Sequence, residues 1–248
     1  MSIVKIGLGG SSGKTGSVIK DLIADNKGRD FELVAELNSR SLETDFTKAG
    51  EISDVIIDFS TPKGFNSLAS IMKNAKAKLV VGTTGLTAEN MKFLGELGKV
   101  KPVLYASNTA IGPNLIAELA AKTAAKLRNY DVEIIEMHHK HKIDAPSGTA
   151  LMLAKEIAKA KNIDFKENIV FSRKDQGKRE EGDIGISSVR GGGIYGEHEI
   201  IFAGENEVIS INCRALSRKS YAEGALLAAS WLNKQPPGLY SMKDIFEF

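Results

Sequence analysis

The feature of this chain that most restricts its fold is the alternation, through its first half, of short apolar runs with amphipathic helical segments. The predicted strands are residues 4–10, 31–37, 54–60, 78–84 and 102–107. Between them, residues 18–23 and 65–72 place apolar side chains on one face at helical spacing. Strands joined by helical crossovers pair in parallel with right-handed connections. The first half therefore predicts an α/β fold with a Rossmann-like, doubly wound parallel sheet.

The pattern changes after residue 114. An alanine-rich helix is predicted over 114–129, a strand over 131–139 and a second helix over 149–161. Four strand-like runs then follow in close succession, at 168–173, 183–190, 197–204 and 207–214. Such a run of strands predicts a second, α+β domain with an open mixed sheet. A final helix over 220–234 is expected to pack back on the first domain, so we expect one domain from 1–109 with 218–248 and another from 110–217.

Composition narrows the classes of partner. The formal net charge of the 248 residues is +2, and the basic residues are spread along the chain apart from a short run at 139–142. Such a balance gives no strong attraction to nucleic acid or to an anionic membrane. No run approaches the ~18 apolar residues of a membrane span, and no signal-peptide pattern opens the sequence. We therefore expect a soluble protein. A single cysteine, Cys213, excludes an intramolecular disulfide and suits the reducing cytoplasm. Because Cys213 lies in an alternating apolar stretch, we expect its thiol to be buried and inert.

A glycine-rich turn ends the first predicted strand and leads into the first helix. After Ile6 the residues run Gly-Leu-Gly-Gly-Ser-Ser-Gly-Lys-Thr-Gly. Glycines there allow positive φ angles and close approach of a diphosphate, whose charge faces the amides at the helix start. The strand–turn–helix order therefore favours a dinucleotide site over a plain turn without a ligand. A P-loop nucleotidase is a minor alternative, because the glycine that Walker A needs five residues before Gly13 is replaced by Leu8.

Polar residues follow three neighbouring strands of this sheet at their carboxyl ends, in the segments 58–62, 82–85 and 106–109. In a doubly wound sheet, ligands bind beyond these ends, so we expect the three loops to share one site. The sequence Gly-Thr-Thr-Gly at 82–85 combines an open backbone with hydroxyl groups that suit a nicotinamide ribose or carboxamide.

The sharpest chemical pattern runs from Glu133 to Ala150 and ends in Asp-Ala-Pro-Ser-Gly-Thr-Ala. The proline, serine and glycine of this run begin a helix whose amides face a bound anion. With the hydroxyl groups of Ser147 and Thr149, these amides form a pocket suited to a carboxylate.

Directly upstream, His138, His139 and Lys142 supply cationic or proton-donating groups. Histidine titrates near neutrality and is a natural proton donor when hydride transfer leaves negative charge on the substrate. The clustered histidines also fit two other interpretations, a zinc site and an incidental charged loop. The spacing His-His-x-His is not that of a standard zinc site, so we expect no metal.

On these residues the chain resembles the 4-hydroxy-tetrahydrodipicolinate reductase (dihydrodipicolinate reductase) family, because the segment 133–150 fills every characteristic position of the family's signature. The resemblance covers nearly the whole chain. It includes Gly10-x-x-Gly13-Lys14-x-Gly16, Asp58-Phe59-Ser60-x-Pro62, Val81-Gly82-Thr83-Thr84-Gly85, Asn108-x-x-x-Gly112-x-Asn114, Arg190-Gly191-Gly192, Gly196-Glu197-His198 and Ser217-Arg218. The histidine–lysine segment is highly specific to the family, whereas the glycine loop alone is not.

The resemblance implies an enzyme of lysine and diaminopimelate biosynthesis. It would reduce 4-hydroxy-tetrahydrodipicolinate to tetrahydrodipicolinate with hydride from NADPH or NADH and release of water. It further implies that residues 1–109 with 218–248 bind the dinucleotide. Residues 110–217 would bind the substrate and join a homotetramer through their sheet.

The resemblance also implies roles for single residues. His138 would be the proton donor/acceptor and Lys142 the second proton donor. The implied substrate-binding residues are His139, Ser147, Gly148 and Thr149. The implied coenzyme contacts are Gly10, Ser11, Ser12, Gly13, Lys14, Thr15, Gly82, Thr83, Thr84, Ala106, Ser107, Asn108 and Thr109.

Two positions depart from the family pattern. Thr15 stands where methionine is usual, which we expect to change loop packing more than chemistry. At the end of the second strand the family often has an acidic residue followed by arginine, and this chain has Asn38, Ser39 and then Arg40. An asparagine cannot repel a 2′-phosphate, and Ser39 and Arg40 can donate to one, so we expect NADPH to be preferred and NADH still used. Glu36 favours the opposite preference, but it lies two residues before the strand's end.

Two other functions fit the same architecture. Another NAD(P)-dependent small-molecule dehydrogenase would need a different substrate segment. A non-catalytic NAD(P)-sensing module would bind the nucleotide with no need for His138 or Lys142.

Overall fold

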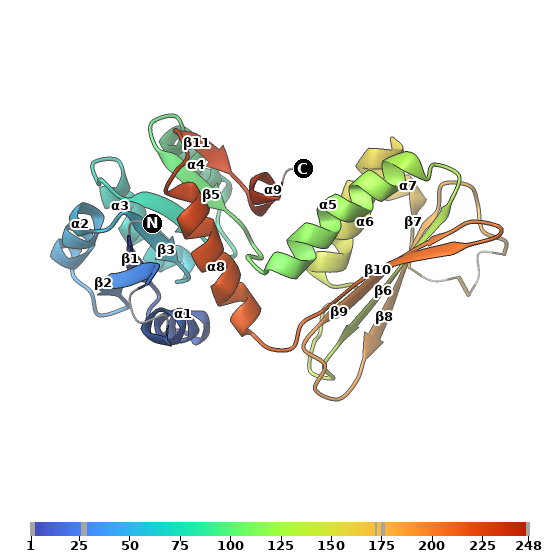
Figure 1. The fold of residues 1–248 in the computed structure, drawn as a ribbon, viewed down its shortest axis with the longest axis horizontal. Coiled ribbons are helices and arrows are strands. Elements are labelled where there is room, and N and C mark those ends of the chain that lie inside the picture. The colour runs from blue at the N-terminus through green and yellow to red at the C-terminus, as the bar shows by residue number, and fades with distance from the viewer. Residues whose placement is uncertain (1–2, 26–28, 172, 175–176, 247–248) are drawn as a thin grey trace. The chain divides into compact units, whose positions relative to one another are not determined.

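The computed structural model describes residues 3–25, 29–171, 173–174 and 177–246. Residue 172, which falls in the predicted strand 168–173, lies outside them. The chain divides into two compact units, Met1–Ile111 with Arg218–Phe248 and Gly112–Ser217 (Figure 1). Each unit has its own sheet and its own apolar core. Among the described residues, no helix has the length and apolar character needed to span a membrane.

The first unit is built on a six-stranded parallel sheet. Its elements are β1 (Val4–Gly9), α1 (Lys14–Asp25), β2 (Phe31–Leu37), α2 (Glu43–Ile52), β3 (Val55–Asp58), α3 (Pro62–Met72), β4 (Lys78–Val81), α4 (Ala88–Gly98), β5 (Pro102–Tyr105), α8 (Lys219–Leu232), β11 (Gly238–Tyr240) and α9 (Met242–Ile245). The strand order is β11-β5-β4-β3-β1-β2, and every pair runs parallel. The order reverses at β1, so the carboxyl ends of β1 and β3 border the crevice in which such sheets bind ligands. The predicted Rossmann-like sheet is confirmed.

Helices cover both faces of this sheet, as strands with near-continuous apolar sequences require (Figure 1). On one face, Ile19 of α1 and Leu226 of α8 belong to an apolar cluster with strand residues such as Ile57. On the other face, Phe46 of α2 and Phe65 of α3 belong to a second cluster. The final helix, α8, therefore packs against the first unit, as the sequence predicts.

The second unit carries a five-stranded mixed sheet. Its elements are α5 (Ile111–Lys126), β6 (Asp131–His138), α6 (Gly148–Lys161), α7 (Phe165–Asn168), β7 (Ile169–Val170), β8 (Ile184–Arg190), β9 (Glu197–Ala203) and β10 (Val208–Arg214). The strand order is β10-β9-β6-β8-β7. The pairs β6/β8 and β7/β8 are parallel, and β6/β9 and β9/β10 are antiparallel. The predicted open mixed sheet is confirmed.

The two faces of the second sheet differ in what covers them. On one face, α5 and α6 bury alternate strand residues, among them Ile134 and Phe202 (Figure 1). The residues of the opposite face include half-buried Ile135 and Ile201. They also include Val208, of which 61% is exposed. We call this second side of the sheet the open face.

Four strands of the first unit are shorter than the sequence predicts, β1 by a single residue at its end. β3, β4 and β5 end at Asp58, Val81 and Tyr105, whereas the predicted strands run to residues 60, 84 and 107. After β3 the chain turns directly into α3, and the hydroxyl of Thr61 caps that helix by accepting the amide of Gly64 at 3.2 Å. The residues beyond the three strand ends form the loops that carry predicted site residues.

Candidate active site

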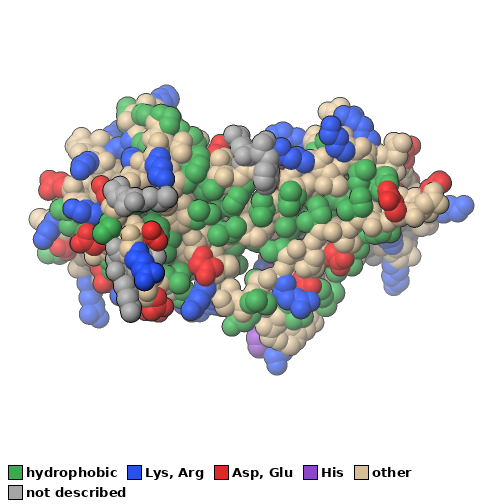
Figure 2. All heavy atoms as spheres, viewed as in Figure 1, with side chains coloured by type: hydrophobic (Ala, Val, Ile, Leu, Met, Phe, Trp, Pro, Cys, Tyr) green, Lys and Arg blue, Asp and Glu red, His purple; other side chains and the backbone are tan. Residues whose placement is uncertain are grey.

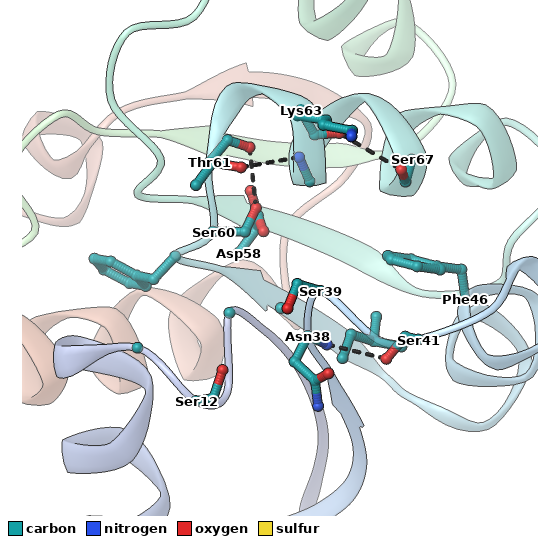
Figure 3. Close-up of a pocket in the computed structure, with 16 residues that line it drawn as sticks. Ser12, Asn38, Ser39, Ser41, Phe46, Asp58, Ser60, Thr61, Lys63 and Ser67 are labelled. Carbon is teal, nitrogen blue, oxygen red and sulfur yellow. Dashed lines mark hydrogen bonds between the residues drawn. The ribbon is translucent and has the colours of Figure 1, made fainter.

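A pocket of about 370 Å³ opens in the first unit at the carboxyl ends of β1, β2 and β3 (Figure 3). The predicted coenzyme residues that line it are Gly10, Ser12, Gly13, Asn38 and Ser39. The opposite wall includes Ser60, from the segment 58–62 that the sequence places at this site, and also Phe46 of α2 with Lys63 and Ser67 of α3, which the sequence does not predict. The pocket lies where the strand order reverses, the position at which such sheets bind dinucleotides.

The glycine loop beside this pocket has the geometry of a diphosphate cradle. Gly10 adopts a φ of 73°, and a methyl group on it would collide with the Phe59 carbonyl. A methyl group on Gly16 would collide with the Gly10 carbonyl, so this glycine lets α1 approach the turn closely. Gly13 is exposed and lines the pocket. The residues present therefore fit the diphosphate of a dinucleotide.

The end of β2 presents an amide side chain where many NADH-selective sites have a carboxylate. The side-chain Oδ1 of Asn38 accepts a hydrogen bond from the backbone amide of Arg40 at 2.9 Å. The backbone amide of Asn38 donates to the Ser41 hydroxyl at 3.0 Å. The carboxylate of Glu36, the other candidate for binding the ribose, forms an ion pair with Lys20 at 2.9 Å. The hydrogen bonds of Asn38 hold the turn that carries Ser39 and the exposed Arg40.

A buried carboxyl group joins the ends of β3 and β4. The Asp58 side chain is 1% exposed and accepts a hydrogen bond from the Thr83 hydroxyl at 2.6 Å. The same hydroxyl accepts the Ser60 amide at 3.0 Å. Burial raises the pKa of Asp58 above its ordinary value, although the hydrogen bonds from Thr83 and Ser60 act in the opposite direction. This group fixes the two loops relative to each other.

The other predicted coenzyme residues lie outside the lining of this pocket. Ser11 is buried, with its amide donated to the Leu37 carbonyl at 3.1 Å. Asn108 accepts the Ala110 amide at 2.9 Å, and Thr109 donates to the Tyr221 carbonyl at 2.7 Å. The rest of this group is Lys14, Thr15, Arg40, Gly82, Thr83, Thr84, Ala106 and Ser107.

In the second unit, the strand register brings four titratable residues together. β6 carries Glu136 and His138 on the same face of the sheet. The register sets His138 opposite Arg190 of β8 and Glu136 opposite His198 of β9. The sequence does not predict roles for Glu136, Arg190 or His198. A signal was present, because Arg190 and His198 belong to two of the runs on which the chain resembles the reductase family, Arg-Gly-Gly and Gly-Glu-His.

Glu136 is the centre of this cluster. Its fully buried carboxylate accepts two hydrogen bonds from Arg190, at 2.7 and 2.8 Å. It also lies 2.6 Å from the His138 Nδ1 and accepts the Ser147 amide at 3.2 Å. Burial alone would raise the pKa of Glu136, but hydrogen bonds from Arg190, Ser188 and His138 lower it to about 2. The carboxylate is therefore ionised across the physiological range.

The two histidine rings of the cluster pack edge to face, with centroids 5.3 Å apart. Burial lowers the pKa of His138, while the hydrogen bond to Glu136 acts in the opposite direction. Burial, followed by the charge of His138, lowers the pKa of His198 to about 4. The His198 Nε2 lies 3.0 Å from the Ser147 hydroxyl. At neutral pH, His198 is thus an uncharged support beside His138.

The predicted substrate residues lie in the segment between β6 and α6. Lys142 forms an ion pair with Asp144 at 2.8 Å. Within the described residues, the Nδ1 atom of His139 is buried without a hydrogen-bond partner. Ser147 caps α6 by accepting the Ala150 amide at 3.1 Å.

Gly148, the first residue of α6, opens onto space. No atom of the described chain would lie within 4 Å of a methyl group on it, and its φ is not in the left-handed region. Neither packing nor backbone conformation therefore requires glycine here. The described residues also contain no group of three histidine, cysteine, aspartate or glutamate side chains arranged to hold a metal ion.

Family models match both halves of the chain. The model described as "Dihydrodipicolinate reductase, N-terminus" matches residues 4–109, and the one described as "Dihydrodipicolinate reductase, C-terminus" matches residues 112–246.

Individual relatives agree with the family models. The 4-hydroxy-tetrahydrodipicolinate reductase of Rickettsia rickettsii (strain Sheila Smith) is 44% identical over 245 residues, which cover 99% of this chain and 100% of the relative. The reductase of the same name from Clostridium perfringens (strain SM101 / Type A) is 41% identical, with 99% of each chain covered.

One solved structure gives the same relationship, and a second shares only the fold. A dihydrodipicolinate reductase from Paenisporosarcina sp. TG-14 with dipicolinate bound has a TM-score of 0.82 and 27% identity, covering 98% of this chain and 100% of that one. A DAP dehydrogenase from C. glutamicum, 15% identical with a TM-score of 0.55, shares the fold alone; the match covers 100% of this chain and 96% of that one.

Proposed function

The chain belongs to the dihydrodipicolinate reductase family, and from this we propose that it is a 4-hydroxy-tetrahydrodipicolinate reductase that uses NAD(P)H. Its product is tetrahydrodipicolinate, an intermediate of lysine and diaminopimelate biosynthesis. The family relationship covers both units over almost their full length, so it does not support the two other functions that the sequence admits, a different dehydrogenase and a non-catalytic sensor.

The observation that carries the catalytic proposal is the cluster around His138. Replacing the substrate's hydroxyl group by hydride consumes one proton, because the hydroxyl leaves as water. The His138 Nδ1 is held by Glu136 at 2.6 Å, so Nε2 is the nitrogen available to deliver that proton. We therefore assign proton transfer to His138, and the role of second proton donor to Lys142 near a substrate carboxylate.

The start of α6 supports binding of a dicarboxylate. The first turn of a helix offers amides and a positive dipole end to an anion, and the open backbone at Gly148 lets a carboxylate approach closely. His139 has a buried, unpartnered Nδ1 within the described part of the chain, which suits a second polar contact. Dipicolinate in the Paenisporosarcina relative is itself a dicarboxylate. We infer that His139, Ser147, Gly148 and Thr149 bind the substrate.

The pocket at the ends of β1, β2 and β3 supports binding of the coenzyme, which supplies hydride when bound. The glycine loop would take the diphosphate, and the turn after β2 would take the adenosine ribose. The amide at Asn38 and the cation at Arg40 accommodate a 2′-phosphate. We propose that NADPH is preferred and that NADH is also used, with the loops at 82–84 and 106–109 contacting the nicotinamide end.

We also propose a homotetramer assembled through the open face of the second sheet. Apolar side chains such as half-buried Ile135 and exposed Val208 lie on the side of the sheet that α5 and α6 do not cover, which suits contact with another copy of the chain. No nucleic-acid or membrane partner is proposed. Lysine and arginine side chains are interspersed with aspartate and glutamate on the visible face of the first unit (Figure 2).

A steady-state assay that generates the unstable substrate enzymatically tests this function. His138→Gln and Lys142→Ala should each lower kcat by ~10²–10⁴, the contribution of a positioned acid or base, and leave coenzyme binding nearly intact. Lys140→Ala, which removes an exposed cation from the same segment, is the matched control and should keep wild-type turnover. Near-normal turnover of His138→Gln or of Lys142→Ala would refute the role assigned to the residue replaced. A wild-type chain that binds coenzyme without reducing the substrate would refute the function.

A further inference from the structure

Glu136 has more hydrogen-bond partners than a simple structural ion pair needs. Each carboxylate oxygen receives one nitrogen of Arg190, and each has a second partner, His138 for one oxygen and Ser147 for the other. A single buried carboxylate therefore connects the ring assigned to proton transfer with the first turn of α6.

We propose that Glu136, clamped by Arg190, is a positioning residue that keeps a proton on the His138 Nδ1, so that Nε2 is the nitrogen that takes up a proton and delivers it to the substrate. An ionised carboxylate can only accept a hydrogen bond, so the nitrogen 2.6 Å from it must carry hydrogen. This inference rests on the proposed function and deepens it. It assigns roles to Glu136 and Arg190, neither of which needs to touch the substrate.

The surroundings of Nε2 agree with this assignment. A methyl group placed on Gly196 would lie 3.1 Å from the His138 Nε2, so the absence of a side chain there keeps this nitrogen uncovered. The His198 ring stands at 76° to the His138 ring and limits its rotation. The two ring nitrogens therefore have different environments, one bonded to Glu136 and the other beside a bare backbone.

Arg190 gives the arrangement a second property. Its guanidinium neutralises Glu136, so the carboxylate orients His138 without exerting the full attraction of an isolated negative charge on the ring proton. The charged and titratable groups that face His138 are Glu136 from β6, Arg190 from β8, His198 from β9 and Lys142 from the following loop. Only Glu136 is negative, so Glu136 and Arg190 should influence the protonation of His138 in opposite directions.

Substitution of each partner separately tests this prediction. Glu136→Gln removes the negative charge and should move the pKa of His138 down by about one unit, whereas Arg190→Gln should move it up. If protonated His138 is the active form, the alkaline limb of the kcat/KM profile should shift in the same directions. Glu136→Gln should also lower kcat at least about tenfold, a part of what the acid itself contributes. Coenzyme KM should stay unchanged.

Glu133→Gln is the matched control. Glu133 also lies on β6 and also accepts a hydrogen bond from an arginine, Arg173, at 2.5 Å, but it does not contact His138. This variant should leave the pH profile in place.

Titration of the 13Cε1 resonances of the histidines in the complete protein measures the His138 pKa directly, with His138→Gln used for assignment. Opposite shifts in the two variants support the inference. Unshifted titrations, or equal losses of activity with unshifted profiles, overturn it. Because this titration needs no turnover, a chain that fails to reduce the substrate refutes the proposed function and still tests whether Glu136 and Arg190 control the protonation of His138. Each variant gives a direction by itself, so misfolding of one leaves the other decisive.

Discussion

The Asn38 side chain uses its oxygen within its own turn, where Oδ1 accepts the Arg40 amide at 2.9 Å. Its Nδ2 group remains a donor, which suits a phosphate oxygen better than the hydrogen-bond-donating hydroxyls of a ribose. The neighbouring carboxylate of Glu36 is paired with Lys20 and lies before the strand's end. At the scale of single residues, these contacts are the basis on which we propose a preference for NADPH.

Arg40→Ala should cost roughly 1.5–3 kcal/mol in NADPH binding, the range for a hydrogen bond to a charged group, and little in NADH binding. Isothermal titration of the protein with each coenzyme measures both values. Lys48→Ala, which removes an exposed cation from α2, is the control and should change neither. A comparable loss for both coenzymes would mean that Arg40 does not contact the 2′-phosphate.

His198 makes stability depend on pH. The pKa of His198 is about 4 in the folded chain, against 6.5 for an ordinary histidine. Between these two pH values the unfolded chain binds a proton at this ring and the folded chain does not. The stabilisation is complete above pH 6.5 and is lost as the pH falls toward 4, by at most about 3 kcal/mol. His198→Gln should flatten this part of the pH dependence of the free energy of unfolding.

Urea unfolding between pH 6.5 and 4.5, at fixed protein concentration, measures this slope. His141→Gln replaces an exposed histidine and should leave the slope as in the wild type. A slope that is unchanged by His198→Gln would show that the ring is protonated in the folded state.

At the scale of elements, apolar runs in the sequence located the strands well but located the ends of the strands poorly. β2 was placed correctly at Phe31–Leu37, although it is the edge strand of its sheet and only Leu37 in it is buried. β3 ends two residues early because Thr61 caps the next helix, a tertiary choice that local apolarity does not record. α2 was not predicted, because Phe46 and Ala49 are the only apolar side chains that it buries, too few to give a helical pattern in the sequence.

The candidate site was predictable where its chemistry is local in sequence. His138, Lys142 and the helix start at Ser147 lie within ten residues, so spacing alone brings them together. Arg190 and His198 reach the cluster only through the register of β6 with β8 and β9, more than fifty residues along the chain. A strand register depends on the packed sheet, which is why the sequence did not assign these two residues a role.

Gly148→Ala separates binding from packing at the start of α6. The described chain leaves room for the added methyl group, so the melting temperature should be unchanged or slightly higher. A methyl group at that point should obstruct a substrate carboxylate and raise the substrate KM at least about tenfold, the equivalent of one lost hydrogen bond to a charged group. Steady-state kinetics and thermal unfolding check the two halves. An unchanged KM would place the carboxylate elsewhere.

At the scale of the whole molecule, the proposed tetramer through the open face of the second sheet can be tested by the mass in solution. We expect light scattering at micromolar concentration to give about four times the 26.7 kDa mass of one chain. Val208→Lys places a charge on that face and should lower the measured mass. Val100→Lys changes a residue of the first unit that is 66% exposed and should leave the mass unchanged. A monomer mass for the wild type would contradict the tetramer.

The position of α8 in the chain has a consequence for synthesis on the ribosome. α8 packs on β3, β4 and β5 of the first unit, yet it is translated only after the whole second unit. At roughly 5–20 residues per second, the intervening hundred or so residues take about 5–20 s to emerge. Throughout that interval, side chains that α8 will cover, such as Val80 and Leu104, lack their final cover. The nascent first unit is thus the stretch that a ribosome-associated chaperone should occupy longest.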